Sequence, residues 1–234
     1  MIINGTAGSD RLVGSNTFDI IDGGAGNDTI DGGSGNDKMK GGSGEDTFLG
    51  GVGADAMDGG IGTDIVDYSA SEAGIKVYLS TGNGYGGQAE GDSFVSIEDV
   101  FGSHYQDLLI GNGGNNTLNG SAGNDRIIGG AGNDTIVGGH GVDQLTGGLD
   151  ADTFAFRASW SGGMSGQDVI TDFTLGQDKL QFIGNTVDDL GDLTFSQVGA
   201  DTLMTYGSRG DSITLLNVDM NQLMANAFTD FLFT

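Results

Sequence analysis

The 234-residue sequence contains no cysteine and no proline. Without cysteine there can be no disulfide bond and no thiol chemistry, so a small core must be stabilised by something else. The lack of proline argues against a proline-rich linker or tail. No apolar run is long enough to span a membrane, and the N-terminal MIINGTAGSD lacks the basic and apolar regions of a Sec signal peptide. We therefore expect neither membrane insertion nor Sec-dependent export.

Basic residues are scarce as well. Lys and Arg number 8 against 33 Asp and Glu, which gives a formal net charge of −25. Because phosphate backbones and anionic lipids bind basic surfaces, nucleic acid and anionic membranes are disfavoured as partners. The only histidines are His104 and His140, and no HExxH, GxSxG or P-loop motif occurs. We therefore expect a noncatalytic protein.

Glycine and aspartate, by contrast, are abundant and recur in a nine-residue repeat. Gly23 to Asp67 reads GGAGNDTID, GGSGNDKMK, GGSGEDTFL, GGVGADAMD and GGIGTDIVD. Each unit has Gly at positions one, two and four, Asp at position six and an apolar residue at position eight. The same frame extends back to Gly5 and resumes from Gly102 to Ala155. Such an internal repeat decides the architecture and is interpreted before any other signal.

Each unit combines a turn with a short strand. Gly, Asn and Asp tolerate the left-handed conformations of tight turns, and the last three residues alternate polar, apolar, polar. Two units make one coil, so equivalent turns lie 18 residues apart and stack at about 4.8 Å. Two Asp carboxylates at that spacing can hold a cation midway, about 2.4 Å from each, which is a calcium–oxygen distance. Hard oxygen ligands without Cys or clustered His favour calcium over zinc or copper.

The units resemble the GGxGxDxUx nonapeptide of repeats-in-toxin (RTX) proteins. The resemblance implies an all-β fold: a parallel β-roll, which is a right-handed β-solenoid, in two nonapeptide blocks with a β-rich C-terminal cap. It also implies several Ca²⁺ ions between successive turns. A metal-free solenoid of Gly and Asn turns is the alternative, but such turns do not require Asp at every sixth position.

The position-six side chains are the predicted metal ligands. The 18-residue rule pairs, for example, Asp28 with Asp46, and the unit holding Asp19 departs most from the motif because it has Ser15, Asn16 and Thr17 in place of G-x-G. The predicted ligands are Asp10, Asp19, Asp28, Asp37, Asp46, Asp55, Asp64, Asp107, Asn116, Asp125, Asp134, Asp143 and Asp152. The predicted inward side chains are Leu12, Ile21, Ile30, Met39, Phe48, Met57, Val66, Leu109, Leu118, Ile127, Ile136, Leu145 and Phe154.

The chain divides by pattern into four parts. Residues 1–67 form the first block, 68–101 a non-repeat insert with a strand at Ile75 to Leu79, 102–155 the second block and 156–234 the cap. In the cap we predict strands at residues 168–173, 179–182, 194–198, 202–206 and 213–218, then a helix from Asp219 to Ala227 that begins with a capping box. The string DVITDFTLGQDKLQF is similar to the segment after the last repeat in serralysin-type proteases. In that family an acid there ligates calcium, and Asp168 and Asp172 are the matching candidates.

The function implied by the resemblance is that of a calcium-folded RTX module. The C-terminal FTDFLFT resembles a type I secretion signal, which makes a type I secretion exporter the expected partner and the bacterial exterior the expected location; the alternative is a buried strand of the cap. One other function is a polysaccharide-binding accessory module like those of alginate epimerases or lyases, with Tyr78, Tyr85 and Trp160 as contributors. Another is the noncatalytic fragment of a secreted protease or lipase.

Overall fold

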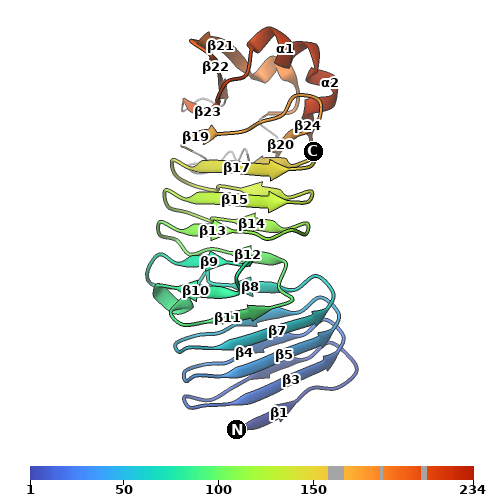
Figure 1. Cartoon of the computed structure of the whole chain (residues 1–234), viewed down its shortest axis with the longest axis vertical. Helices are drawn as coiled ribbons and strands as arrows, with labels where there is room; N and C mark the ends of the chain where they lie inside the picture. The colour runs from blue at the N-terminus through green and yellow to red at the C-terminus, as the bar shows by residue number, and fades with distance from the viewer. Residues whose placement is uncertain (158–165, 185–186, 207–209) are drawn as a thin grey trace. The chain divides into compact units, whose positions relative to one another are not determined.

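The computed structural model describes the chain except for residues 158–165, 185–186 and 207–209. It divides into two compact units, Met1–Asn112 and Gly113–Thr234. In both units short strands stack in register, mostly parallel, and successive strands of the repeat alternate between two sheets (Figure 1). This arrangement confirms the predicted all-β parallel roll.

In the first unit the two sheets have the strand orders β1-β3-β5-β7-β11-β10-β9-β13 and β2-β4-β6-β8-β12. Lys38 lies opposite both Ile20 and Ala56 in parallel register, so each coil advances the chain by 18 residues. The bounds are β1 (Ile2–Asn4), β2 (Arg11–Val13), β3 (Ile20–Ala25), β4 (Thr29–Asp31), β5 (Lys38–Ser43), β6 (Thr47–Leu49), β7 (Ala56–Ile61), β8 (Ile65–Asp67), β9 (Lys76–Tyr78), β10 (Asn83–Tyr85), the 3-10 helix η1 (Gly87–Ala89), β11 (Ser93–Val95), β12 (Asp99–Phe101) and β13 (Leu108–Ile110).

The residues between the two blocks are built into the roll. The expected strand is present as β9, and β10 pairs with it in antiparallel fashion. Strands β11 and β12 pair in parallel with β7 and β8, as another coil of repeats would. The insert therefore extends both sheets although its sequence has lost the nine-residue period.

The second unit carries the second block and the cap. Its sheets have the orders β15-β17-β19-β23-β22-β21 and β14-β16-β18-β20-β24. The bounds are β14 (Thr117–Asn119), β15 (Arg126–Ala131), β16 (Thr135–Val137), β17 (Gln144–Leu149), β18 (Thr153–Arg157), β19 (Gln167–Ile170), β20 (Lys179–Ile183), η2 (Leu190–Asp192), β21 (Thr194–Val198), β22 (Asp201–Tyr206), β23 (Asp211–Leu215), α1 (Met220–Ala225), α2 (Ala227–Asp230) and β24 (Phe231–Phe233).

The cap continues both sheets and then closes them. Strands β19 and β20 add in parallel to β17 and β18, and β24 adds to β20. The side chain of Asp219 accepts hydrogen bonds from the N–H groups of Asn221 and Gln222, which confirms the predicted helix start. Helix α1 ends at Ala225, two residues before the expected end. In the described parts of the chain, no helix has the length and apolar character needed to cross a membrane.

The core is a single line of position-eight side chains in each sheet. All of the predicted inward residues are buried except Leu12, which is half-buried. In the cap, aromatic side chains add to this line and form a cluster. The ring of Phe182 stacks on Phe156 at 5.8 Å and on Phe233 at 5.8 Å and meets the edge of Tyr206 at 5.5 Å. The repeats thus bury one apolar residue per nine, whereas the cap has a thicker hydrophobic core.

Several position-four glycines lie too close to the preceding coil to carry a side chain. Gly62 has φ of 149°, and a Cβ atom on it would lie 1.7 Å from the carbonyl oxygen of Gly44 in the preceding coil. Only glycine allows both this backbone conformation and this approach. The glycines therefore set the stacking distance of the turns.

We expect Gly62→Ala to destabilise the roll, because the added methyl group would force two stacked turns apart. The loss should exceed the roughly 1–3 kcal/mol that a strained φ alone costs. The matched control is Gly8→Ala, since Gly8 is also at position four but a Cβ there meets only the Thr6 hydroxyl at 4.0 Å. Denaturant unfolding of both variants in calcium tests this; equal stability would contradict it.

Candidate metal centres in the stacked turns

The position-six side chains lie inside the turns, each directly before a short strand. Asp28 precedes β4, Asp46 precedes β6 and Asp134 precedes β16. All thirteen are buried except Asp10, which is half-buried. A buried carboxylate is costly unless its charge is matched or its oxygens accept hydrogen bonds. These acids are therefore not a solvated charged surface.

One oxygen of each carboxylate links two coils. The backbone N–H of Asp28 donates to Oδ1 of Asp46 at 2.8 Å, and that of Asp46 donates to Oδ1 of Asp64 at 2.8 Å. Every predicted 18-residue pair within one unit is joined in this way, at 2.7–2.9 Å: Asp10–Asp28, Asp19–Asp37, Asp28–Asp46, Asp37–Asp55, Asp46–Asp64, Asn116–Asp134, Asp125–Asp143 and Asp134–Asp152. Asp107 and Asp125 belong to different units, and their pairing stays a prediction. We call this series of hydrogen bonds the aspartate ladder.

The ladder differs from the expected pair of carboxylates facing each other across one ion, because Oδ1 is already an acceptor. The remaining oxygen is Oδ2. In the part of the chain that the structure describes, no hydrogen-bond donor reaches this buried atom in Asp28, Asp37, Asp46, Asp55, Asp64, Asp134, Asp143 or Asp152. An acceptor without a donor in a buried position indicates a positively charged ligand or a proton.

The space in front of Oδ2 is bordered by a backbone carbonyl of the next coil. A Cβ atom on Gly23 would lie 2.4 Å from Oδ2 of Asp28 and 2.6 Å from the carbonyl oxygen of Gly41. The same arrangement recurs at Gly129, where these distances are 2.3 Å to Asp134 and 2.6 Å to Gly147. Position-one glycine thus keeps a small space open between a carboxylate and a carbonyl oxygen. Such oxygen ligands suit calcium, so the residues present fit the metal that the sequence predicts.

Burial raises the pKa of several carboxyl groups of the ladder. It raises the pKa of Asp55 and Asp134 to about 7, and that of Asp64 and Asp152 to about 6; neighbouring carboxylates add to the effect in all four. The chain thus brings like charges together in places where water does not screen them. Either a proton or a cation must neutralise these sites.

Three acids outside the repeat continue the ladder and were missed in the sequence. The N–H of Asp55 donates to Asp92 at 2.8 Å, that of Asp64 to Glu98 at 2.9 Å and that of Asp152 to Asp178 at 3.0 Å. Each of these acids directly precedes a short strand, as the repeat aspartates do. This placement, an acid directly before a strand without the full set of motif glycines, is the signal that could have revealed them.

The two candidate ligands in the cap border the last repeat turns. Oδ1 of Asp168 accepts a hydrogen bond from the N–H of Asp143 at 3.0 Å, so Asp168 occupies the next position of the ladder. Burial raises the pKa of Asp168 to about 7. Asp172 accepts from the N–H groups of Gly147 at 3.0 Å and Gly148 at 2.8 Å. The structure thus brings both acids to the repeat, Asp168 through the ladder and Asp172 through the turn.

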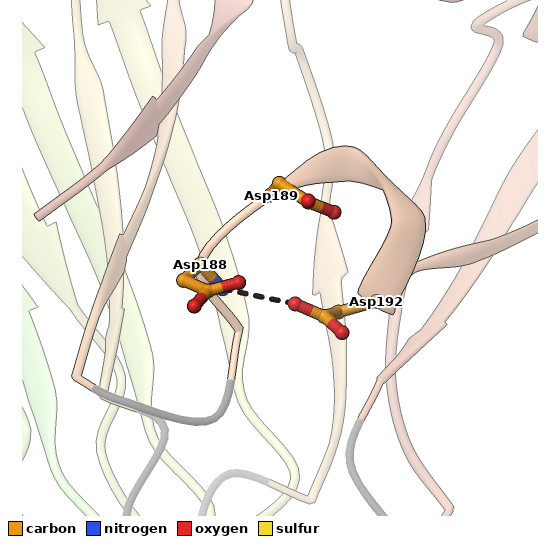
Figure 2. Close-up of side chains that lie close together, drawn as sticks. All are labelled: Asp188, Asp189 and Asp192. Carbon is orange, nitrogen blue, oxygen red and sulfur yellow. Dashed lines mark hydrogen bonds between the residues drawn. The ribbon is translucent and has the colours of Figure 1, made fainter.

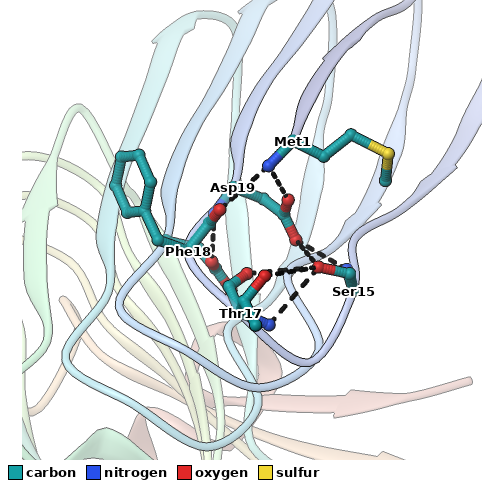
Figure 3. A network of polar contacts seen from close by, with 6 residues as sticks. Met1, Ser15, Thr17, Phe18 and Asp19 are labelled. Carbon is teal, nitrogen blue, oxygen red and sulfur yellow. Dashed lines mark hydrogen bonds and ion pairs between the residues drawn. The ribbon is translucent and has the colours of Figure 1, made fainter.

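Some turns satisfy Oδ2 with the chain's own donors. In the network of Figure 3, the N–H and hydroxyl of Ser15 donate to Oδ2 of Asp19 at 2.6 and 2.8 Å, and the amino group of Met1 donates to Oδ1. The amino group and Ser15 together lower the pKa of Asp19, in contrast to the raised values above. Asp10, Asp107 and Asp178 have an equivalent N–H donor four residues earlier, in Thr6, Ser103 and Thr174.

A further acidic group lies in the cap, outside the ladder. The carboxylates of Asp188, Asp189 and Asp192 lie within 4.8 Å of one another and are exposed (Figure 2). The N–H of Asp188 donates to Asp192 at 3.1 Å, and the side chain of Asp189 caps η2 by accepting from Gly191. These hydrogen bonds explain the three acids as parts of a turn and a helix cap.

Comparison with known proteins gives one family. The model of the RTX calcium-binding nonapeptide repeat matches four times, at residues 4–39, 34–66, 101–136 and 119–154. No curated protein matches the chain.

Similar solved structures include the extracellular lipase LipA from Serratia marcescens, at 25% identity and a TM-score of 0.39 over 93% of this chain and 39% of the lipase. They also include the AlgE6R2 and AlgE6R3 subunits of the Azotobacter vinelandii mannuronan C5-epimerase. Their identities are 29% and 28%, both with a TM-score of 0.40, over 56% and 57% of this chain and 90% and 81% of those subunits. The chain thus spans about two fifths of the length of the lipase.

The raised pKa values predict how stability without metal depends on pH. Between the ordinary Asp value of 3.8 and about 7, the folded chain binds more protons than the unfolded chain, so its stability should fall as the pH rises through this range. In chelator, circular dichroism should show more β structure at pH 5 than at pH 7.5. With saturating calcium the β signal at pH 7.5 should match that at pH 5, because the cation replaces the protons. More β structure in chelator at pH 7.5 would contradict the expectation.

Proposed function

The chain belongs to the family of RTX calcium-binding nonapeptide repeat proteins, and from this premise we propose that it is a module that folds on calcium binding outside the cell. In this role it supports the type I secretion and the stability of an exported protein. The observation that carries the proposal is the row of buried Oδ2 atoms, several of which lie beside a carbonyl oxygen of the next coil. We propose no catalytic role for the module.

The proposed ligands are Asp125 and the repeat aspartates whose buried Oδ2 accepts no hydrogen bond from the described residues, together with the carbonyl oxygens that lie beside several of them, such as that of Gly41 beside Asp28. Calcium supplies two positive charges where burial brings carboxylates together, and it joins groups from successive coils. Asp168 and Asp172 stay candidates beside the last repeat turns, because Asp168 has a raised pKa and Asp172 lies on the turn itself. The proposed ligands are Asp28, Asp37, Asp46, Asp55, Asp64, Asp125, Asp134, Asp143 and Asp152.

Metal binding and folding are coupled in this proposal. The repeats bury few apolar side chains, and at a net charge of −25 the carboxylates repel one another when no cation is bound. Since the stacked turns exist only in the folded chain, the free energy of calcium binding is free energy of folding. A chain in a cytosol with little free calcium would stay unfolded and could be threaded through an exporter.

The proposed export signal at the C-terminus is part of the folded cap. Asp230 is buried and accepts hydrogen bonds from the N–H of Gly176, and Phe231–Phe233 forms β24 on β20. Asp230 and Phe231 are buried, so an exporter could contact these two residues only when the cap is unfolded. The order of events in the proposal is therefore contact with the exporter, passage of the chain, and folding on extracellular calcium.

Polysaccharide binding is the second candidate function. Tyr85 is 48% exposed and its ring meets the ring of Tyr78 edge to face at 5.9 Å, which offers an aromatic surface to a sugar. Trp160, the third aromatic residue that we considered, lies outside the described residues. A glycan array distinguishes this function, because a module that only folds and stabilises its cargo would bind no glycan.

Calcium should drive folding at neutral pH. In chelator at pH 7.5 the repeats should lack regular structure because of charge repulsion, and titration with calcium should produce the β signal in circular dichroism. The expected affinity is at the weak, extracellular end, roughly 10⁻⁴ to 10⁻³ M. Magnesium at the same ionic strength is the control, since it prefers a smaller octahedral shell and keeps its water. A full β signal in chelator at this pH would refute the proposal.

Removal of Phe228 to Thr234 should abolish secretion by a type I exporter while the repeats still bind calcium. The assay compares the protein in the culture supernatant for the full and truncated chains, with bound calcium measured on purified material. Phe228→Ser is the matched control, because Phe228 is fully exposed and a single change there leaves β24 intact. Undiminished export of the truncated chain would place the signal elsewhere. Loss of calcium binding together with export would favour a purely structural role for this segment.

A further inference from the structure

We propose that the second residue of each turn decides, through its own backbone N–H, whether the aspartate of that turn binds calcium. The inference rests on the proposed function, in which calcium binds in the turns. We call a turn closed when the N–H four residues before the aspartate donates to its Oδ2, and open when it does not. Closed turns hold their aspartate without metal, and only open turns bind calcium.

Among the described residues four turns are closed, and their geometry is uniform. The N–H groups of Thr6, Ser15, Ser103 and Thr174 donate to Oδ2 of Asp10, Asp19, Asp107 and Asp178 at 2.6, 2.6, 2.7 and 2.7 Å. In the first three the hydroxyl of the same residue adds a second hydrogen bond to the carboxylate, at 2.7–2.8 Å. These donors favour the charged form of the carboxylate and occupy the oxygen that has no such donor in the open turns.

The open turns have a different backbone at the second residue. Gly24, Gly42 and Gly148 have φ of 99°, 111° and 113°, whereas none of the four closed-turn residues has positive φ. The N–H of Gly148 donates to Asp172 at 2.8 Å and thus serves a carboxylate other than that of its own turn, Asp152. With this N–H directed elsewhere, Oδ2 of Asp152 receives no donor from the described residues and borders the position-one glycine.

Ser121 separates the effect of backbone conformation from that of residue type. It is a serine at the second position, as in the closed turns, but its φ is 69°. Its N–H donates to the side chain of Asn119 at 2.9 Å. A Cβ on Gly120 would lie 2.3 Å from Oδ2 of Asp125 and 2.7 Å from the Gly138 carbonyl, the arrangement of the open turns. The N–H of Ser121 thus serves a side chain other than the aspartate of its own turn, as the N–H of Gly148 does.

Two neighbours in the ladder give a matched test. Asp152 is in an open turn, and its own N–H donates to Asp178, which is in a closed turn. Asp→Asn keeps the shape of the side chain and an oxygen acceptor but removes the charge. Bound calcium per chain, measured by equilibrium dialysis with atomic emission, should be unchanged in Asp178→Asn and lower by at least one ion in Asp152→Asn. The same contrast is expected in the first unit between Asp107→Asn and Asp64→Asn.

Asp10 keeps the test interpretable if a buried variant does not fold. It is half-buried and in a closed turn, and its ladder partner Asp28 is in an open one. Asp10→Asn should keep the wild-type calcium number and Asp28→Asn should not, with circular dichroism in saturating calcium confirming that both are folded. Equal losses within the pairs would overturn the inference while leaving calcium-driven folding intact. Full calcium binding in every variant would overturn it together with the ligand assignment. A wild-type chain that binds no calcium would instead refute the proposed function.

Discussion

The structure depends on the hydrogen bond from the backbone N–H of one aspartate to the carboxylate of the aspartate one coil later. This bond joins residues 18 apart in the repeats and buries a carboxylate in the turns that have an aspartate at position six. The bond uses only one oxygen of the carboxylate. The other oxygen, Oδ2, therefore needs a cation, a proton or another hydrogen-bond donor of the chain. The coil spacing, the acidity and the metal requirement thus have one origin.

Other features of the molecule depend on which groups surround Oδ2. Position-one glycines leave the space in front of it, and position-four glycines let the turns stack closely enough to bring a carbonyl beside it. Where the repeat ends, the chain supplies other groups. The hydroxyl of Tyr68 donates to Oδ2 of Asp92 at 2.5 Å. In the cap, the aromatic cluster around Phe182 provides the burial that the thin repeats lack, so folding there depends less on metal.

Much of this structure was predictable from the sequence, because each feature of the repeat depends on residues that are close together in the chain. Positive-φ glycines, an acid before each three-residue strand and one apolar residue per unit are properties of single nonapeptides, and repetition makes them unmistakable. The parallel roll, the buried position-eight residues and the coil of two units were predicted for this reason. The capping box at Asp219 was readable because its hydrogen bonds span only a few residues.

What the tertiary structure decided concerns contacts between coils. The sequence does not show that Oδ1 is taken by a neighbouring N–H, that Asp92, Glu98 and Asp178 continue the ladder, or that the C-terminal segment is strand β24. These partners lie 26 to 51 residues apart and follow no period, so no local pattern encodes them. The sequence by itself determined the repeating unit and indicated its metal, because the same Gly and Asp positions recur every nine residues. Only the folded chain decided which carboxylate oxygens keep no donor, because that depends on how each turn meets its neighbour.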